Sequence, residues 1–136
     1  MTQQQATGGS LLMDCLIGLG AYKGFGVPGE SYLAVLDAMY DRAEKFELIL
    51  CRHEGGAAYM AEAWGKLTGT PGICFVTRGP GASNASIGIH TAMQNSSPML
   101  VFVGQVGTDM RGREAFQEID YTHYFGKVAK WGWELD

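Results

Sequence analysis

The chain has 136 residues, 46% of them hydrophobic and 18% charged, which is the composition of one soluble globular domain and excludes a disordered chain. Its formal net charge is −4 and its basic residues are scattered singly, so nucleic acid is not an expected partner. No apolar run approaches the roughly 20 residues of a membrane helix, and residues 1–10 lack the pattern of a secretion signal, so a cytoplasmic location is expected.

The N-terminal part of the chain predicts a helix, a strand and a second helix. Residues 1–9 are expected to be flexible, and Ser10 is the expected N-cap of a helix that ends near Gly18 and Gly20. The apolar positions of this helix are Leu11, Leu12, Cys15, Leu16 and Leu19. A short strand over 23–27 follows, and then a helix over 31–42. The apolar face of the second helix is Leu33, Leu36 and Tyr40.

The middle of the chain alternates apolar runs with helical patterns. Residues 46–51 form a nearly continuous apolar run, which predicts a strand covered on both faces and therefore a parallel sheet. Another buried strand is expected at 73–77, a further apolar strand at 99–104, and a helix at 82–94. The residues at helical separations in that segment are Ile87, His90 and Met93.

Another helix, over 57–67, carries large and small side chains on different surfaces. The large ones form a single stripe that consists of Met60, Trp64 and Leu67. The other surface is small throughout and consists of Ala57, Ala58, Ala61 and Gly65. Small residues let a neighbouring surface come close, so a partner is expected to pack there.

The alternation of strands and helices predicts an α/β fold. We expect a single domain over 1–136, with a doubly wound, mostly parallel sheet and helices on both faces. Beyond Val106 the pattern weakens, and it predicts a mobile loop at 108–114, a short helix at 120–127 and a last strand at 128–133.

Ligands of such sheets bind outside the carboxyl ends of the strands. The segments that follow the apolar runs are 28–30, 52–56, 78–81 and 105–107, so they are expected to converge on one rim.

The glycines at 79 and 81 in this set are ambiguous by themselves. A Gly-x-Gly between a strand and a helix is found in phosphate cradles, but a Walker loop needs a following Gly-Lys-Ser/Thr, and the dinucleotide fingerprint needs a third glycine where Asn84 stands. A structural turn is therefore the better interpretation.

Glu54 also has two interpretations. It follows a predicted buried strand and precedes two glycines, where apolar surroundings would favour the protonated carboxyl group. Taken alone, a solvated acid in the first turn of a helix is the more common case.

The three cysteines, Cys15, Cys51 and Cys74, show neither a zinc spacing nor a CxxC pair, so buried reduced thiols are expected and no metal site is predicted. Cys51 and His53 are a third candidate, a nucleophilic pair of a hydrolase. The pair is disfavoured because residues two apart on a strand have no guaranteed contact, and buried cysteines are usually inert.

Five motifs taken together change these interpretations. They occur in register, most of them after a predicted strand, and read FGVPGE at 25–30, RHEGGAAYMA at 52–61, TRGPGASN at 77–84, GQV at 104–106 and AFQE at 115–118. In this order they resemble the N-terminal pyrimidine-binding domain of the thiamine diphosphate enzymes that include acetolactate synthase, pyruvate oxidase and benzaldehyde lyase. The resemblance extends from about residue 10 to residue 133.

The resemblance implies a role for particular residues. Glu54 matches the glutamate that hydrogen-bonds N1′ of the cofactor's aminopyrimidine and relays a proton in its activation. The positions that match the pyrimidine pocket are Val27, Pro28, Gly29, Pro80 and Asn84. Phe116 and Gln117 match a pair on the substrate side. Arg78 departs from the acetolactate synthases, which usually have Ser at this position.

The resemblance also implies partners. In this family Mg²⁺ and the diphosphate are bound by a separate C-terminal domain through Gly-Asp-Gly and Asn-Asn, which this sequence lacks. Some relatives bind FAD in a middle domain, which this chain also lacks. We therefore expect an isolated domain or truncated product, inactive alone, that binds a 2-keto acid within a homodimer or higher homo-oligomer formed through the helix of Ala57, Ala58 and Ala61. The alternative is a non-catalytic assembly or binding module that keeps the fold.

Overall fold

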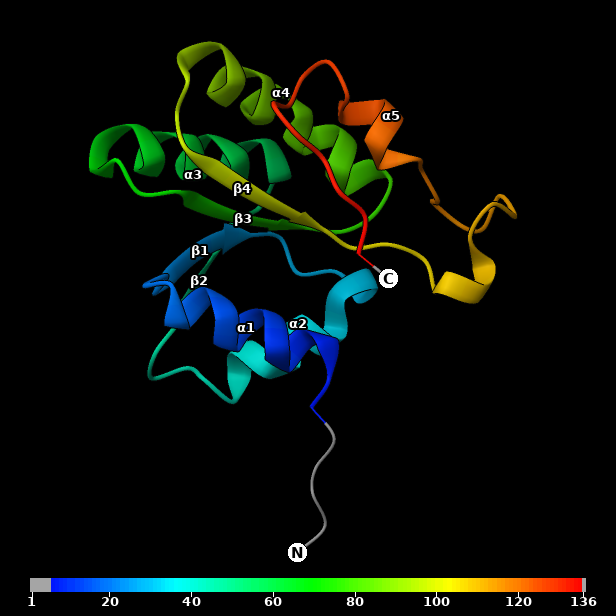
Figure 1. Cartoon of the computed structure of the whole chain (residues 1–136), viewed down its shortest axis with the longest axis horizontal. Coiled ribbons are helices and arrows are strands. Elements are labelled where there is room, and N and C mark those ends of the chain that lie inside the picture. The colour runs from blue at the N-terminus through cyan, green and yellow to red at the C-terminus, as the bar shows by residue number, and fades with distance from the viewer. Residues whose placement is uncertain (1–5, 136) are drawn as a thin grey trace, which may run out of the picture.

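The computed structural model describes residues 6–135 and contains a parallel sheet of four strands in the order β2-β1-β3-β4 (Figure 1). The strands are β1 (Lys23–Gly26), β2 (Glu47–Leu50), β3 (Gly72–Val76) and β4 (Met99–Val103). The chain winds outward from β1 in both directions, so the predicted doubly wound α/β fold is confirmed.

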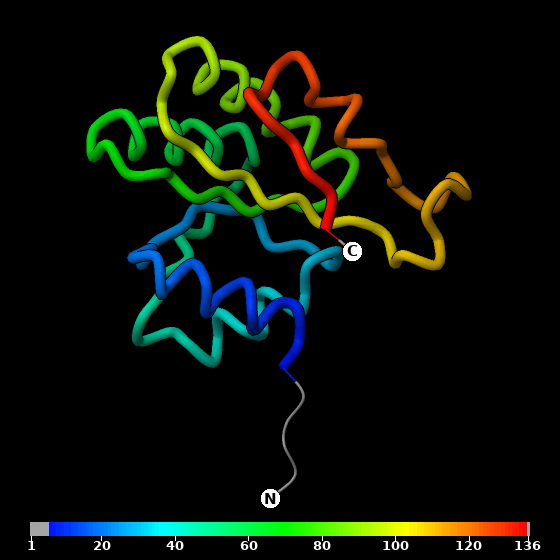
Figure 2. The backbone as a smooth tube through the Cα atoms, viewed as in Figure 1, coloured from blue at the N-terminus to red at the C-terminus, as the bar shows by residue number. Residues whose placement is uncertain are grey.

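The helices form a layer on each face of this sheet. On one face lie α1 (Gly8–Gly18) and α2 (Leu33–Tyr40), the latter preceded by the 3-10 turn η1 (Glu30–Tyr32). On the other lie α3 (Glu54–Thr68) and α4 (Pro80–Asn95). After β4 the chain runs outward through η2 (Thr108–Met110) and returns to α5 (Tyr121–Phe125) beside α4 (Figure 2).

Strand β3 lies in the centre of the core. Alternate side chains of a strand point to opposite faces, so Cys74 and Val76 pack under α3 and α4 while Ile73 and Phe75 pack under α1 and α2. The Phe75 ring stacks on Phe102 with 5.2 Å between ring centroids. All five residues of β3 are buried, which confirms the prediction of a fully covered strand here.

The small surface of α3 packs against α4 of the same chain and not against a partner. Ala57, Ala58 and Ala61 are completely buried within the chain, whereas Leu67 is 85% exposed and Ile87 51% exposed. The two helices pack so closely that a Cβ atom at Gly88 would lie 2.5 Å from the Cβ atom of Ala58. Only small residues fit between helices at this separation, so the predicted dimer contact through Ala57, Ala58 and Ala61 is wrong.

The N-terminal helices also pack on other residues than predicted. α1 begins at Gly8 and its N-cap is Thr7, whose hydroxyl accepts the N–H of Ser10. Residues 8 and 9 are therefore helical, and residues 1–5 of the predicted flexible segment lie outside the described residues. Gly9 of α1 lies against the backbone of Ala34 of α2. The two helices therefore face each other with surfaces other than the predicted apolar ones. As a result the side chains of several predicted apolar positions are exposed: Leu11, Cys15, Leu19, Leu33 and Tyr40.

Two strand predictions are also wrong. β2 pairs only with β1 and is therefore an edge strand, so its side chains are half-buried or exposed rather than covered on both faces. Residues 128–133 form no strand. There Trp131 and Trp133 stack on each other at the surface, with 6.4 Å between ring centroids.

Candidate functional site

The rim of the sheet is built where β1 and β3 end side by side. Their connections leave to opposite faces, β1 toward α2 and β3 toward α4, which is the arrangement that opens a crevice in α/β sheets. The hydroxyls of Ser31 and Thr77 are 2.8 Å apart across this point, and Ser31 Oγ accepts the N–H of Arg78 at 3.0 Å. A Cβ atom at Gly29 would lie 2.4 Å from Thr77 Cβ, so the close approach requires glycine.

Glu54 is the first residue of α3, at the end of β2. His53 is the N-cap, and its Nδ1 atom accepts the N–H of Gly55 at 3.0 Å. The half-buried Glu54 carboxylate accepts a hydrogen bond from Asn84 Nδ2 of α4 at 2.9 Å. Its other oxygen lies 3.4 Å from the place where a Cβ atom of Gly81 would be. The fold thus brings Glu54 and Asn84, both predicted to bind the cofactor, together with Gly81 of the predicted rim.

The turn after β1 is held by Tyr32. The Tyr32 hydroxyl donates to the carbonyl of Val27 at 2.5 Å. Burial raises the pKa of the Tyr32 phenol, and the charges of Cys74 and Glu54 add to the rise. Val27 is half-buried and Pro28 is exposed at the rim, as is Pro80 at the start of α4.

Phe116 and Gln117, the predicted substrate-side pair, lie against the glycine turn after β3. Gly79 has φ +58°, and a Cβ atom there would lie 2.7 Å from Gln117 Cβ. Gln117 itself has φ +62°, and Phe116 is 73% exposed. The N–H of Gly79 donates to the Tyr121 hydroxyl at 2.8 Å. Tyr32 and Tyr121 were not predicted as site residues, because no sequence spacing links Tyr121 to the turn at Gly79.

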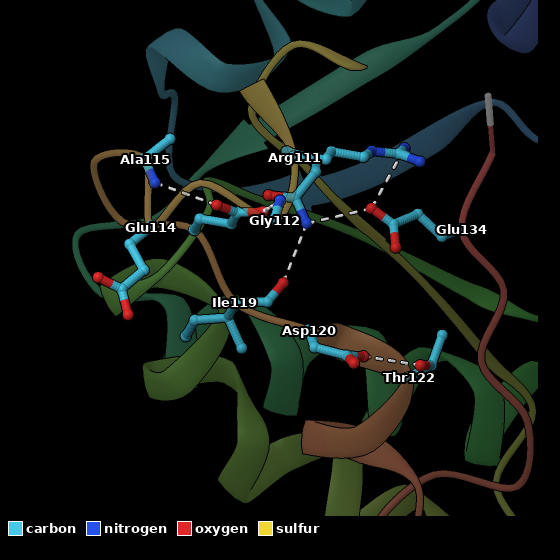
Figure 3. Close-up of a pocket in the computed structure, with 10 residues that line it drawn as sticks. Arg111, Gly112, Glu114, Ala115, Ile119, Asp120, Thr122 and Glu134 are labelled. Atoms are coloured by element: carbon cyan, nitrogen blue, oxygen red, sulfur yellow. Dashed lines mark hydrogen bonds and ion pairs between the residues drawn. The ribbon is translucent and has the colours of Figure 1, made fainter. Parts of the chain in front are cut away.

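A hollow of about 600 Å³ lies beside the segment 111–122, and its lining includes none of the predicted site residues (Figure 3). Its carboxylates hold the segment together. Glu118 accepts the backbone N–H groups of Gly112 and Ala115 at 2.6 and 3.0 Å, and Glu134 is 3.1 Å from Arg111 Nη2. These two N–H groups lower the pKa of Glu118.

Asp120, at the edge of the same hollow, is the N-cap of α5, and its stabilising effect should disappear only in strong acid. Hydrogen bonds from the Thr122 hydroxyl and the His123 backbone N–H lower its pKa from 3.8 to about 2. Because the folded value is the lower one, the contribution to stability is present above the unfolded pKa and is lost as the pH falls through about 2.

We expect the acid transition of Asp120 to appear in the NMR shifts of residues in α5, as a change below about pH 3. An Asp120→Asn variant keeps a capping acceptor but cannot ionise, so its shifts should stay level over this range. A midpoint near pH 4 in the native chain would show that the cap does not form.

The arrangement around Cys51 does not support a nucleophilic pair. The Cys51 thiol lies 3.7 Å from the carbonyl of Ile49 and 3.7 Å from the sulfur of Met60, while the ring of His53 caps α3. Cys74, the one buried cysteine of the described residues, has its thiol pKa raised to about 12, mainly by burial. A thiol of this kind is inert near neutral pH.

The chain was compared with known protein families and with individual proteins. The profile of the family "Thiamine pyrophosphate enzyme, N-terminal TPP binding domain" matches residues 6–124. The chain belongs to this family. It is 42% identical over 125 residues to the mitochondrial acetolactate synthase catalytic subunit of Aspergillus candidus, covering 92% of this chain and 18% of that protein.

Bacterial relatives are similarly close to this thiamine pyrophosphate enzyme domain. The acetolactate synthase of Bacillus subtilis is 40% identical over 128 residues, covering 94% of this chain and 22% of the relative. The acetolactate synthase large subunit of Lactococcus lactis is 39% identical over 133 residues, covering 98% and 23%. The chain thus spans about a fifth of the length of these relatives. Among the helices of residues 6–135, none has the length and apolar character needed to cross a membrane.

Proposed function

We propose that this chain is the pyrimidine-binding, proton-relaying part of an acetolactate synthase-like enzyme that uses thiamine diphosphate to act on 2-keto acids. The observation that carries the proposal is the position of Glu54, whose carboxylate lies at the strand-end rim, hydrogen-bonded to Asn84 and next to Gly81. Family membership and the similarity to acetolactate synthases support it.

The residues at the rim fit the pyrimidine of the cofactor. Gly29 and Gly81 have no side chains, so Thr77 packs against both turns and keeps their backbones close together at the rim. Glu54 offers a carboxyl group that can share a proton with a ring nitrogen, and Val27 and Pro28 offer apolar and backbone contacts. When bound, thiamine diphosphate supplies a carbon acid whose anion adds to a carbonyl and later accepts electrons.

Within this chain Glu54 holds and moves the proton at N1′ of the pyrimidine. The Asn84 amide orients the carboxyl group by donating to one of its oxygens, which leaves the other free to face the ring. In this proposal Phe116 and Gln117, which lie beside the turn at Gly79, orient the carbonyl of the 2-keto acid.

The rest of the active site comes from other domains in this proposal. Mg²⁺ and the diphosphate are held by a domain outside this chain, in the same or another subunit of a homo-oligomer, and a middle domain is where FAD would bind. The exposed side of α3 and α4 carries a group of apolar side chains: Tyr59, Met60, Ile87 and Met93. A surface of this kind suits the diphosphate-binding domain of another subunit. A cytoplasmic location remains a prediction.

Removing the Asn84 amide tests the role of the rim. In the complete gene product, Asn84→Ala should lower the turnover of pyruvate, at saturating thiamine diphosphate and Mg²⁺, about 10-fold to 100-fold. A hydrogen bond to a charged group is worth roughly 1.5–3 kcal/mol, and its loss leaves the Glu54 carboxyl group less well oriented.

The matched control for this variant is Asn95→Ala. Asn95 of α4 also donates to a glutamate of α3, Glu62, at 3.1 Å, but this pair lies at the other end of the helices. Turnover should change less than about twofold there. Equal losses in both variants would contradict the proposal, and activity independent of added thiamine diphosphate would favour a non-catalytic role for the domain.

A further inference from the structure

Arg78 joins parts of the rim that are far apart in the sequence. Its Nη2 atom is 2.6 Å from a carboxylate oxygen of Glu30, and its Nε–H donates to the backbone carbonyl of Phe116 at 3.0 Å. The Arg78 side chain is only 14% exposed, whereas that of Glu30 is 68% exposed. One guanidinium therefore connects the turn after β1, the turn after β3 and the segment 115–121.

These contacts depend on the length and shape of arginine. The guanidinium is planar and donates in several fixed directions, so it can bind a carboxylate and a carbonyl together. A serine at this position would be too short to extend from the turn to both acceptors. Charge-assisted bonds are stronger than neutral ones. Water screens the ion pair at the exposed Glu30, so the bond to the Phe116 carbonyl is the contact that holds the segment directly.

The segment that Arg78 holds contains a strained residue. Gln117 has a left-handed backbone, φ +62°, which is unfavourable for a residue with a side chain. It packs against Gly79, directly after Arg78, while Phe116 bonds to the Arg78 side chain. Contacts on both residues therefore maintain a conformation that the segment does not prefer by itself.

We propose that Arg78 is a positioning residue that holds Phe116 and Gln117 over the rim, and so sets the affinity of the enzyme for its 2-keto acid. The ion pair with Glu30 fixes the orientation of the Arg78 guanidinium. The affinity statement rests on the proposed function, whereas the structural statement concerns this chain alone.

Hydrogen exchange tests the structural statement. In the complete gene product, Arg78→Ser should speed amide exchange in 115–121 at least tenfold and leave β3 and α4 unchanged. The matched control is Arg42→Ser, which removes a comparable ion pair, with Asp14, from a side chain that is 19% exposed. Arg42 lies before β2, at the other edge of the sheet, so exchange in 115–121 should not respond. Unchanged exchange in Arg78→Ser, or an equal increase in the control, would overturn the proposal.

Kinetics test the affinity statement. Arg78→Ser should raise KM for pyruvate at least fivefold, while kcat and the affinity for thiamine diphosphate change less than twofold, because Glu54 and Asn84 are untouched. Arg78→Lys keeps the ion pair with Glu30 but loses the planar donor, so its KM should lie between the KM of the native enzyme and that of Arg78→Ser.

If Arg78→Ser does not fold, Glu30→Gln is the substitute, with a KM increase of about twofold. A loss confined to kcat would overturn the proposal, whereas a native protein without keto-acid activity would contradict only the proposed function and leave the exchange result to decide the role of Arg78.

Discussion

Replacing Glu54 with Gln should lower the turnover of pyruvate by the complete gene product at least a hundredfold. The amide has nearly the shape of the carboxyl group and can still accept from Asn84, so the hydrogen bond between α3 and α4 persists. It cannot donate and recover a proton at a ring nitrogen, and such acid–base steps are worth about 10²- to 10⁴-fold. Steady-state turnover at saturating thiamine diphosphate and Mg²⁺ measures the effect.

Glu62→Gln is the matched control for this variant. Glu62 lies on the same helix, is buried, and accepts from Ser97 and Asn95 at 2.7 and 3.1 Å. These bonds lower its pKa, so it is a structural carboxylate, and its replacement should affect stability more than turnover. Turnover should stay within about twofold of the native value. Equal rates for the Glu54→Gln variant and the native enzyme would end the proposal that this residue activates the cofactor.

Replacing Phe75 with Ala should lower the free energy of unfolding by about 3–5 kcal/mol, the range for a large aromatic side chain removed from a core. Phe75 is 1% exposed and contacts aromatic rings on three sides, with centroids of Phe102, Phe46 and Tyr32 at 5.2, 6.2 and 6.4 Å. A cavity there removes the contacts with Phe102 of β4, with Tyr32 of η1 and with Phe46, the residue before β2. The loss is a large part of the roughly 5–15 kcal/mol that stabilises a typical domain.

Urea unfolding followed by circular dichroism measures this loss. The native chain and the variant should have the same slope with denaturant concentration, and only the midpoint should move. Phe116→Ala is the control, because Phe116 is 73% exposed and its truncation should change the free energy of unfolding by less than about 0.5 kcal/mol. A loss below about 1 kcal/mol for Phe75→Ala would mean that the aromatic cluster is not well packed.

Several features of the fold could be predicted because they depend on neighbours in the sequence. The apolar run at 73–77 identifies β3, and the alternation of strands and helices identifies a parallel sheet. The carboxyl ends of parallel strands meet at one edge, so the convergence of the segments that carry Glu54 and Gly81 also follows from chain order.

Which surface of a helix is buried could not be predicted in the same way. Met60, Trp64 and Leu67 form an apolar stripe on α3, yet the packed surface is the one with Ala57 and Ala61. Hydrophobic spacing identifies a stripe but contains no information on how close the next helix lies. The small residues of α3 and α4 allow a short separation, which leaves no room between the helices for Met60 and Leu67, while Trp64 packs on Phe25 at the side of α3.

The sequence by itself determined the fold class, the family resemblance and the glutamate on which the proposed chemistry depends, because these are properties of local patterns and of residues that follow strands. Only the tertiary structure decided that Asn84 contacts Glu54, that Tyr121 holds Gly79 and that Arg78 joins Glu30 to Phe116. The physical reason is that a hydrogen bond requires two atoms to lie within about 3 Å, and residues 30 or more positions apart reach that distance only through the packing of the whole chain.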